Sequence, residues 1–143
     1  MTQYIDVYDN FLSSYYNDSY EKTFNGSEGN SFSWFFLNDL NGRKYRGNFY
    51  FCNVAYDPTL NINDTSQYAI YQPLLNRLNI TMSNVKRLKS NLYPLSGRRV
   101  HHQTHIDYEP NQGFRTCLYY VHESNRLTIF DGKQKIKCKN NRA

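Results

Sequence analysis

Several segments after Val85 alternate apolar and polar residues, which is the pattern of strands with one buried face. In "VKRLKSNLY", residues 85–93, Leu88 and Leu92 share one face of such a strand. The opposite face carries Arg87, Lys89, Asn91 and Tyr93. The pattern therefore predicts a half-buried strand at this point of the chain.

Three more strands are expected further along. "RTCLYYV", residues 115–121, is rich in β-forming residues. "RLTIF", residues 126–130, and "QKIKCK", residues 134–139, follow it and are joined by an Asp131-Gly132 turn, which favours a hairpin. Strands that are joined by turns this short pair antiparallel.

The first half of the chain mixes helix and strand patterns. Residues 4–12, "YIDVYDNFL", predict a short strand that ends at Asp9 and Asn10, and Ser13 can cap a helix through "SYYNDSYEK". Residues 32–51 are aromatic and interrupted by an Asn-Gly pair, which predicts two strands or a strand and a turn. Pro73 suits the first turn of a second helix, "QPLLNRLNI". Its apolar stripe would consist of Leu74, Leu75 and Leu78.

Helices followed by antiparallel strands predict a sandwich or jelly roll with helical support. A chain of 143 residues, 39% hydrophobic and 17% aromatic, fits one domain with one core. We therefore expect a single domain over residues 1–143, mainly β with flanking helices. Residues 1–84 would support the core strands of residues 85–143.

The sequence also indicates the cellular location of the protein. It has no signal-peptide pattern and no apolar stretch near the ~20 residues that span a bilayer. We expect a soluble, cytoplasmic protein without a membrane partner. The 3 cysteines are widely spaced and include no C-x-x-C pair, so neither a disulfide framework nor a zinc ribbon is expected.

The formal charge of +5 raises the question of a nucleic-acid partner. Much of the excess lies near the end of the sequence, where every second residue is a lysine: Lys133, Lys135, Lys137 and Lys139. On a strand these side chains form one solvated face, which also discourages pairing with other chains. Since no RNP-like or helix-turn-helix pattern occurs, a nucleic-acid partner is the less favoured explanation.

The segment "HHQTHIDYEP", residues 101–110, concentrates three of the chain's 4 histidines. In an extended segment His105 and Asp107 leave the same face, which His101 shares and His102 does not. An imidazole and a carboxylate are two parts of the 2-His-1-carboxylate set that holds ferrous iron. An isolated H-x-D is common, however, and a His and an Asp satisfied on a strand end are the alternative.

The order of the surrounding segments is a second indication of an iron site. "RLKSNLYP", "HHQTHIDYEP", "RTCLYYVHESNRLTIFDG" and "KIKCKNNR" follow one another within residues 85–142. In this order they resemble the core of the 2-oxoglutarate- and Fe(II)-dependent oxygenases, in particular the prolyl-hydroxylase-like branch and its small phage and marine-microbe members. The N-terminal "IDVYDNFLS" and "FSW" resemble the same family's lead-in. The resemblance implies a double-stranded β-helix, the cupin-like jelly roll.

The resemblance also implies site residues and cofactors. His105 and Asp107 would be ligands of Fe(II), and Tyr93 would reach the co-substrate 2-oxoglutarate near the metal. Tyr120 would contact the far carboxylate of 2-oxoglutarate from the face that it would share with Leu118 and Thr116. As an alternative, both tyrosines could be core residues with a satisfied hydroxyl. The family hydroxylates a substrate while oxidising 2-oxoglutarate to succinate and CO2, with ascorbate as a reductant in assays.

Residues 1–143 hold no counterpart of the family's second histidine ligand or of the arginine that pairs with the far carboxylate. We therefore expect the jelly roll to be incomplete and the chain alone to be inactive. An open sheet edge there would allow self-association. His122, where the family has Asn, is a candidate substitute ligand. A non-catalytic binding module and, less favoured, a basic nucleic-acid-binding β protein remain as alternatives, and the substrate is not specified.

Overall fold

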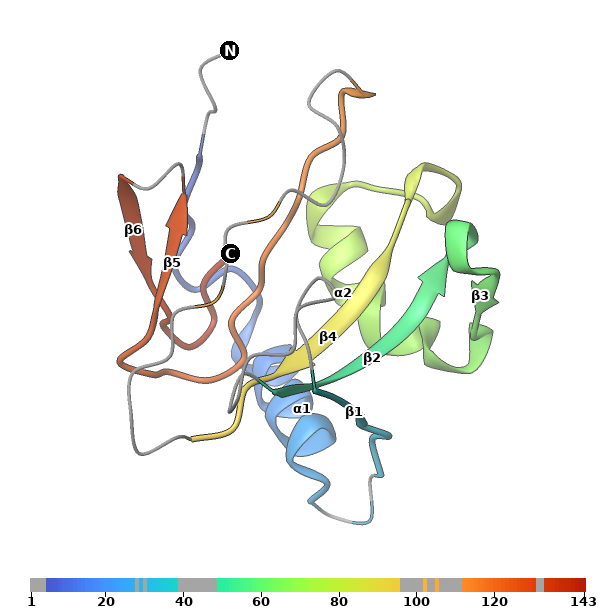
Figure 1. Ribbon diagram of the computed structural model, residues 1–143, viewed down its shortest axis with the longest axis horizontal. Coiled ribbons are helices and arrows are strands. Elements are labelled where there is room, and N and C mark those ends of the chain that lie inside the picture. Colours follow the sequence, from blue (N-terminus) through green and yellow to red (C-terminus); the bar gives the residue numbers. More distant parts are fainter. Residues whose placement is uncertain are drawn as a thin grey trace. The chain divides into compact units, whose positions relative to one another are not determined.

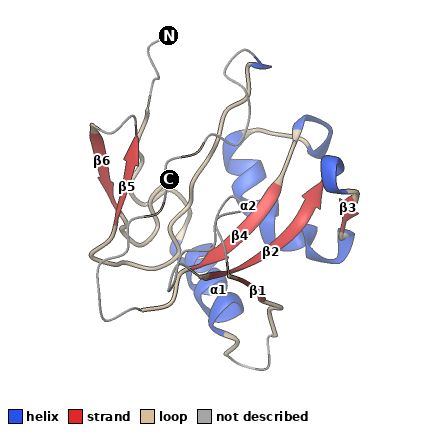
Figure 2. Cartoon of the chain, viewed as in Figure 1, coloured by secondary structure: helices blue, strands red, loops and turns tan. Residues whose placement is uncertain are grey.

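The computed structural model describes residues 5–27, 29, 31–38, 49–95, 102, 105, 112–130 and 133–143. These parts of the chain combine helices with antiparallel strands in two sheets (Figure 1, Figure 2). The predicted antiparallel pairing is confirmed, whereas the jelly roll and the division of one domain at residue 84 stay predictions. The chain forms two compact units. The sheet unit comprises residues 33–72 and 80–114, and the hairpin unit comprises residues 1–32, 73–79 and 115–143.

The sheet unit is built on its longest strand, β2 (Tyr50–Asp57), which contains aromatic residues and a valine, all of which favour strands. Strand β1 (Phe35–Leu37) pairs antiparallel with one edge of β2, and β4 (Leu88–Leu92) pairs antiparallel with the other edge. The short strand β3 (Ile62–Asn63) pairs with the end of β2. β1 and β4 confirm strands expected in these parts of the sequence, whereas β2 begins at the end of the expected segment, residues 32–51, and continues beyond it to Asp57.

The two faces of β4 differ as the alternation predicts. Leu88 is buried, and Ser90 on the same face shares a hydrogen bond of 2.9 Å with the Tyr71 hydroxyl. Tyr71 belongs to helix α2 (Tyr68–Leu78), so this face of the sheet is in contact with the helix. Burial raises the pKa of the Tyr71 phenol, because ionisation would place a charge away from water.

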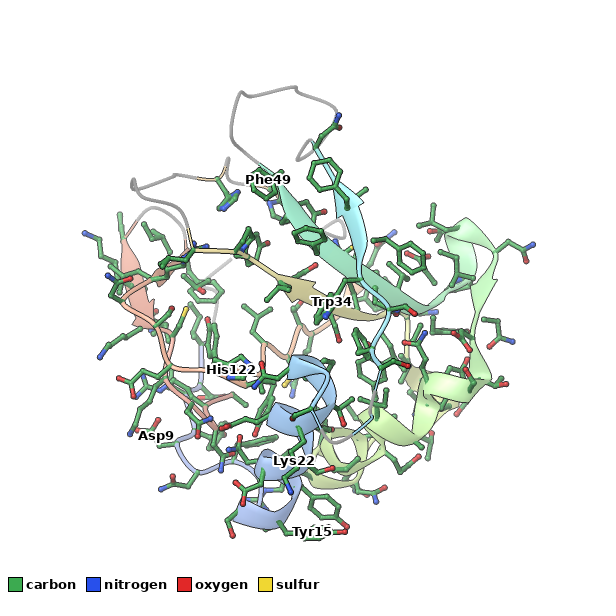
Figure 3. The ribbon with its side chains drawn as sticks, turned by 90° about the horizontal axis from the view of Figure 1, so that it is seen from below. Asp9, Tyr15, Lys22, Trp34, Phe49 and His122 are labelled. Atoms are coloured by element: carbon green, nitrogen blue, oxygen red, sulfur yellow. The ribbon has the colours of Figure 1, made fainter. Side chains whose placement is uncertain are left out.

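An exposed aromatic cluster lies where β1 meets the start of β2. The rings of Phe36 and Phe51 are 5.7 Å apart, and the ring of Phe49 lies 5.6 Å from that of Phe36. Phe36 and Phe51 are directly opposite each other in the register. Figure 3 shows the Phe49 side chain at this end of β2. Edge and tilted contacts of this kind stabilise a sheet face even where it stays accessible to water.

In the hairpin unit, helix α1 (Ser14–Asn25) begins directly after Ser13, as predicted. The helix ends at Gly26, whose φ of 67° lies in the left-handed region that glycine adopts without strain. The amides of Gly26 and Ser27 donate to the carbonyls of Thr23 and Lys22, at 3.3 and 3.1 Å. These two bonds satisfy carbonyls that the helix end would otherwise leave without donors.

The hairpin after which the unit is named consists of β5 (Leu127–Phe130) and β6 (Gln134–Lys137). The strands pair antiparallel from Leu127↔Lys137 to Phe130↔Gln134, which confirms the predicted hairpin. Lys135 and Lys137 are exposed and Ile136 is half-buried, as expected for lysines on one solvated face. The Asp131-Gly132 turn lies outside the described residues.

The last residues of the chain bind two distant segments of the hairpin unit. Tyr8 and Ala143 exchange backbone hydrogen bonds of 2.8 and 3.0 Å, and the Tyr120 amide donates to the Arg142 carbonyl at 2.9 Å. Asn141 is buried, accepts a hydrogen bond from the Leu12 amide at 2.8 Å and donates to the Leu12 carbonyl at 2.9 Å. The backbone groups of Tyr8 and Tyr120 are therefore bonded to the last residues of the chain and not to a neighbouring strand.

Two predicted strands are therefore wrong. Residues 115–121 contain only an isolated bridge, Tyr120↔Arg142, and residues 5–12 contain only the bridge Asp9↔Arg142. Both segments pair with the few residues around Arg142 instead of with a full-length strand. The alternation of apolar and polar residues in a segment does not show how long the strand that it pairs with will be.

The second helix is correct in kind and wrong in its start. It begins at Tyr68, so that Pro73 lies inside it and not in its first turn. A 3₁₀ turn, Thr65–Gln67, precedes it, and the Asp64 carboxylate accepts a hydrogen bond from the Ser66 amide at 3.2 Å. Because this turn feeds directly into the helix, the proline no longer marks the boundary. Within the described ranges, no helix has the length and apolar character to cross a bilayer.

Candidate functional site

The polar face of β4 carries a group of side chains that we call the Tyr50 cluster: Tyr50, Lys89, Tyr93 and His102. All four belong to the sheet unit. The register pairs Val54 with Lys89 and Cys52 with Asn91, so the next pair along this face brings Tyr93 opposite Tyr50. The cluster therefore follows from the antiparallel register of β2 and β4.

Tyr50 is the centre of the cluster. It is buried, at 7% exposure, and its ring stacks on that of Tyr93 with centroids 5.5 Å apart and planes at 21°. The Lys89 ammonium nitrogen lies 5.2 Å from the Tyr50 ring centroid and donates to the Tyr50 hydroxyl at 3.4 Å. One ring thus contacts both an aromatic partner and a cation, which are favourable contacts for a phenol.

Tyr93 connects the strand to the histidine-bearing segment. It is 38% exposed, and its ring centroid lies 5.0 Å from that of His102. His102 is half-buried. Tyr93, which is predicted to contact the co-substrate, therefore lies beside His102, which belongs to the segment predicted to hold the metal.

The predicted metal ligands are only partly described. His105 is exposed, while Asp107 and His101 lie outside the described residues. In the portion of the chain that the structure describes, no three His, Cys, Asp or Glu side chains gather as they would around a metal ion. The assignment of His105 and Asp107 to iron stays a prediction.

Tyr120 lies in the hairpin unit, in surroundings unlike those of Tyr93. It is half-buried, and its hydroxyl shares a hydrogen bond of 2.5 Å with the Thr128 hydroxyl on β5. Burial raises the pKa of its phenol, while the hydrogen bond to Thr128 acts in the opposite direction. Because no strand forms at residues 115–121, the face that Tyr120 would share with Thr116 and Leu118 is not a strand face. Its contact with 2-oxoglutarate stays a prediction.

His122 is exposed and follows Tyr120 in an irregular segment (Figure 3). This position does not show whether His122 binds the metal, so its role as a substitute ligand stays a prediction. Sequence reasoning missed Tyr50 and, although it placed Lys89 on the correct face, gave Lys89 no role. The available signal was the alternation in "NFYFC", which puts Tyr50 on the opposite face from Phe49 and Phe51.

The chain matches no protein-family model, no curated protein and no solved structure.

Proposed function

We propose that this chain is an Fe(II)- and 2-oxoglutarate-dependent oxygenase domain of the prolyl-hydroxylase-like kind, with a jelly-roll core. The observation that carries the proposal is the contact of the Tyr93 and His102 rings, 5.0 Å apart. In such a domain the tyrosine that reaches the co-substrate and the segment that holds the metal must be neighbours. The motif order predicts the same neighbourhood from sequence alone.

The donors on this face suit an anionic co-substrate. Two phenols, an ammonium and an imidazole lie together in the Tyr50 cluster, and none of them carries negative charge at neutral pH. His105 and Asp107 would hold the iron, which when bound supplies the chemistry that activates O2. Tyr93 would orient 2-oxoglutarate through its hydroxyl, and stacking on the buried Tyr50 would fix the plane of the Tyr93 ring.

The metal site is tested with Mn(II), which occupies ferrous sites without supporting the reaction. We expect the 143-residue chain to bind one Mn(II), measured by electron paramagnetic resonance. Each of His105→Ala and Asp107→Ala should weaken binding by about tenfold or more, as loss of a ligand does. Asp18→Ala, which removes an exposed carboxylate of helix α1, is the control and should have no effect. Unchanged binding in both ligand variants would refute the assignment.

The activity is tested by succinate formation from 2-oxoglutarate with ferrous iron and ascorbate. Residues 1–143 should turn over poorly, because one imidazole and one carboxylate leave the metal one protein ligand short. A peptide that supplies a strand with a histidine and an arginine should restore succinate formation, and His105→Ala should abolish the restored activity. Rapid turnover without the peptide would show that His122 or another residue completes the site.

A further inference from the structure

Lys89 is the cation of the Tyr50 cluster, and its side chain runs along the sheet in a defined direction. Its backbone lies opposite Val54, whereas its ammonium reaches Tyr50, four residues earlier on β2. The side chain therefore passes over the Cys52–Asn91 pair toward the Tyr93 end of the face. This direction places the charge over the ring of Tyr50, which stacks on that of Tyr93.

The charge of Lys89 is not neutralised within the part of the chain that the structure describes. Its contacts there are the hydroxyl and the ring of Tyr50. Two lysines of the hairpin unit differ from Lys89: Lys137 pairs with Glu123 and Lys139 pairs with Asp9, each at 3.1 Å. A bound anion would therefore give half-buried Lys89 a partner for its charge.

Tyr50 supplies a second donor at the same place. Lys89 donates to the Tyr50 oxygen, so the phenol proton remains to be donated. Among the described contacts nothing accepts that proton, although the Tyr50 side chain is more than nine-tenths buried, at 7% exposure. An ammonium and a phenol O–H that meet at one point match the two oxygens of a carboxylate.

We propose that Lys89 and Tyr50 bind a carboxylate of a small organic acid whose chain extends along this face toward Tyr93. The identity of that acid as 2-oxoglutarate rests on the proposed function; the carboxylate site does not. One cation and one neutral donor balance a single negative charge, which favours a carboxylate over a phosphate dianion.

The site is tested with glutarate, which has the same chain length and two carboxylates but no keto group to chelate a metal. We expect saturable binding of glutarate to the metal-free 143-residue chain, measured by calorimetry or by NMR shifts of the Tyr50 and Tyr93 rings. Lys89→Met keeps the apolar stem, removes the charge and should weaken binding by about tenfold or more. Lys89→Arg should keep most of the affinity.

Lys86→Met is the matched control. Lys86 lies in the same unit and also over an aromatic ring, with its nitrogen 5.3 Å from the Phe114 centroid, yet it is exposed. Its loss should leave glutarate binding unchanged. Equal affinity of the wild type and Lys89→Met for glutarate, with both folded by circular dichroism, would overturn the carboxylate site. Preference of the wild type for inorganic phosphate over glutarate would also overturn it.

A comparison with 2-oxoglutarate separates this inference from the proposed function. If both hold, Mn(II) strengthens binding of 2-oxoglutarate but not of glutarate, and Lys89→Met weakens both acids. If only the carboxylate site holds, the two acids bind alike, Mn(II) has no effect, and Lys89→Met still weakens both. If only the proposed function holds, Mn(II) strengthens 2-oxoglutarate binding equally in the wild type and in Lys89→Met.

Discussion

The two units of this protein are stabilised by different kinds of contact. In the sheet unit, β2 pairs with a strand on each edge, and aromatic rings lie on both faces. In the hairpin unit, polar side chains make many of the contacts, beside the rings of Phe11, Tyr20 and Tyr119. The Tyr119 hydroxyl donates to the amide oxygens of Asn17 and Asn141, and Arg142 forms two hydrogen bonds with the Asp9 carboxylate at 2.7 and 3.0 Å.

This difference sets how each unit should respond to substitution. A backbone ladder tolerates the loss of one side chain, because the neighbouring bonds remain. A buried polar network is sensitive, since removing one member leaves its partners without hydrogen bonds. The Tyr50 cluster belongs to the sheet unit, so none of its four residues is a member of the polar network of the hairpin unit.

The largest effect is expected at Asn141. Its side chain serves both backbone groups of Leu12 and accepts from the Tyr119 hydroxyl at 3.1 Å, and its φ of 54° is left-handed. Asn141→Ala should lower the free energy of unfolding by about 2–4 kcal/mol, by leaving buried groups unsatisfied and by straining the backbone.

Asn141→Gly is the matched variant, because it removes the same hydrogen bonds while relieving the strain at positive φ. It should be less destabilising than Asn141→Ala by about 1 kcal/mol. Denaturant unfolding measures both values, and amide exchange at Leu12 should accelerate in each. A loss below about 0.5 kcal/mol in both variants would show that the network is not central to the hairpin unit.

A smaller effect is expected from Tyr71→Phe in the sheet unit. The change removes the 2.9 Å hydrogen bond to Ser90 and keeps the ring. We expect a loss of about 1 kcal/mol in the free energy of unfolding, the typical contribution of one hydrogen bond. Ser90→Ala in the Tyr71→Phe background should add little, and a fully additive double variant would mean that the bond does not contribute.

The smallest effect is expected from acid, acting on the ion pairs that Asp9 forms with Arg142 and Lys139. Hydrogen bonds from Arg142 and Lys139 lower the pKa of Asp9 from 3.8 to about 2. The pair should therefore contribute fully above pH 3.8 and lose its contribution as the pH falls toward about 2, because the unfolded chain takes up the proton first.

Asp9→Asn should reduce this part of the acid dependence in unfolding measured between pH 5 and pH 2. Glu123→Gln is the control, since the Glu123 and Lys137 side chains are 59% and 55% exposed and such pairs contribute little. An acid dependence that Asp9→Asn leaves unaltered would show that the pair with Arg142 is not formed in solution.

Local sequence signals predicted much of the secondary structure. Ser13 before α1, the alternation of β4 and the hairpin pattern of β5 and β6 are each encoded within a few residues, and the structure agrees with them. The two failed strands, residues 115–121 and 5–12, have comparable local patterns. Their form depends on Arg142, whose partner Asp9 lies 133 residues away in the sequence.

For the candidate site the sequence named Tyr93 and the segment that holds His102, and it placed Lys89 on the same strand face as Tyr93. Alternation determines such faces because successive side chains of any strand point to opposite sides. Only the tertiary structure decided that Tyr50 would stack on Tyr93 and contact Lys89. That contact depends on the register between β2 and β4, which is set by long-range backbone pairing and packing. The residues of one strand do not specify which residue of a distant strand will lie opposite them.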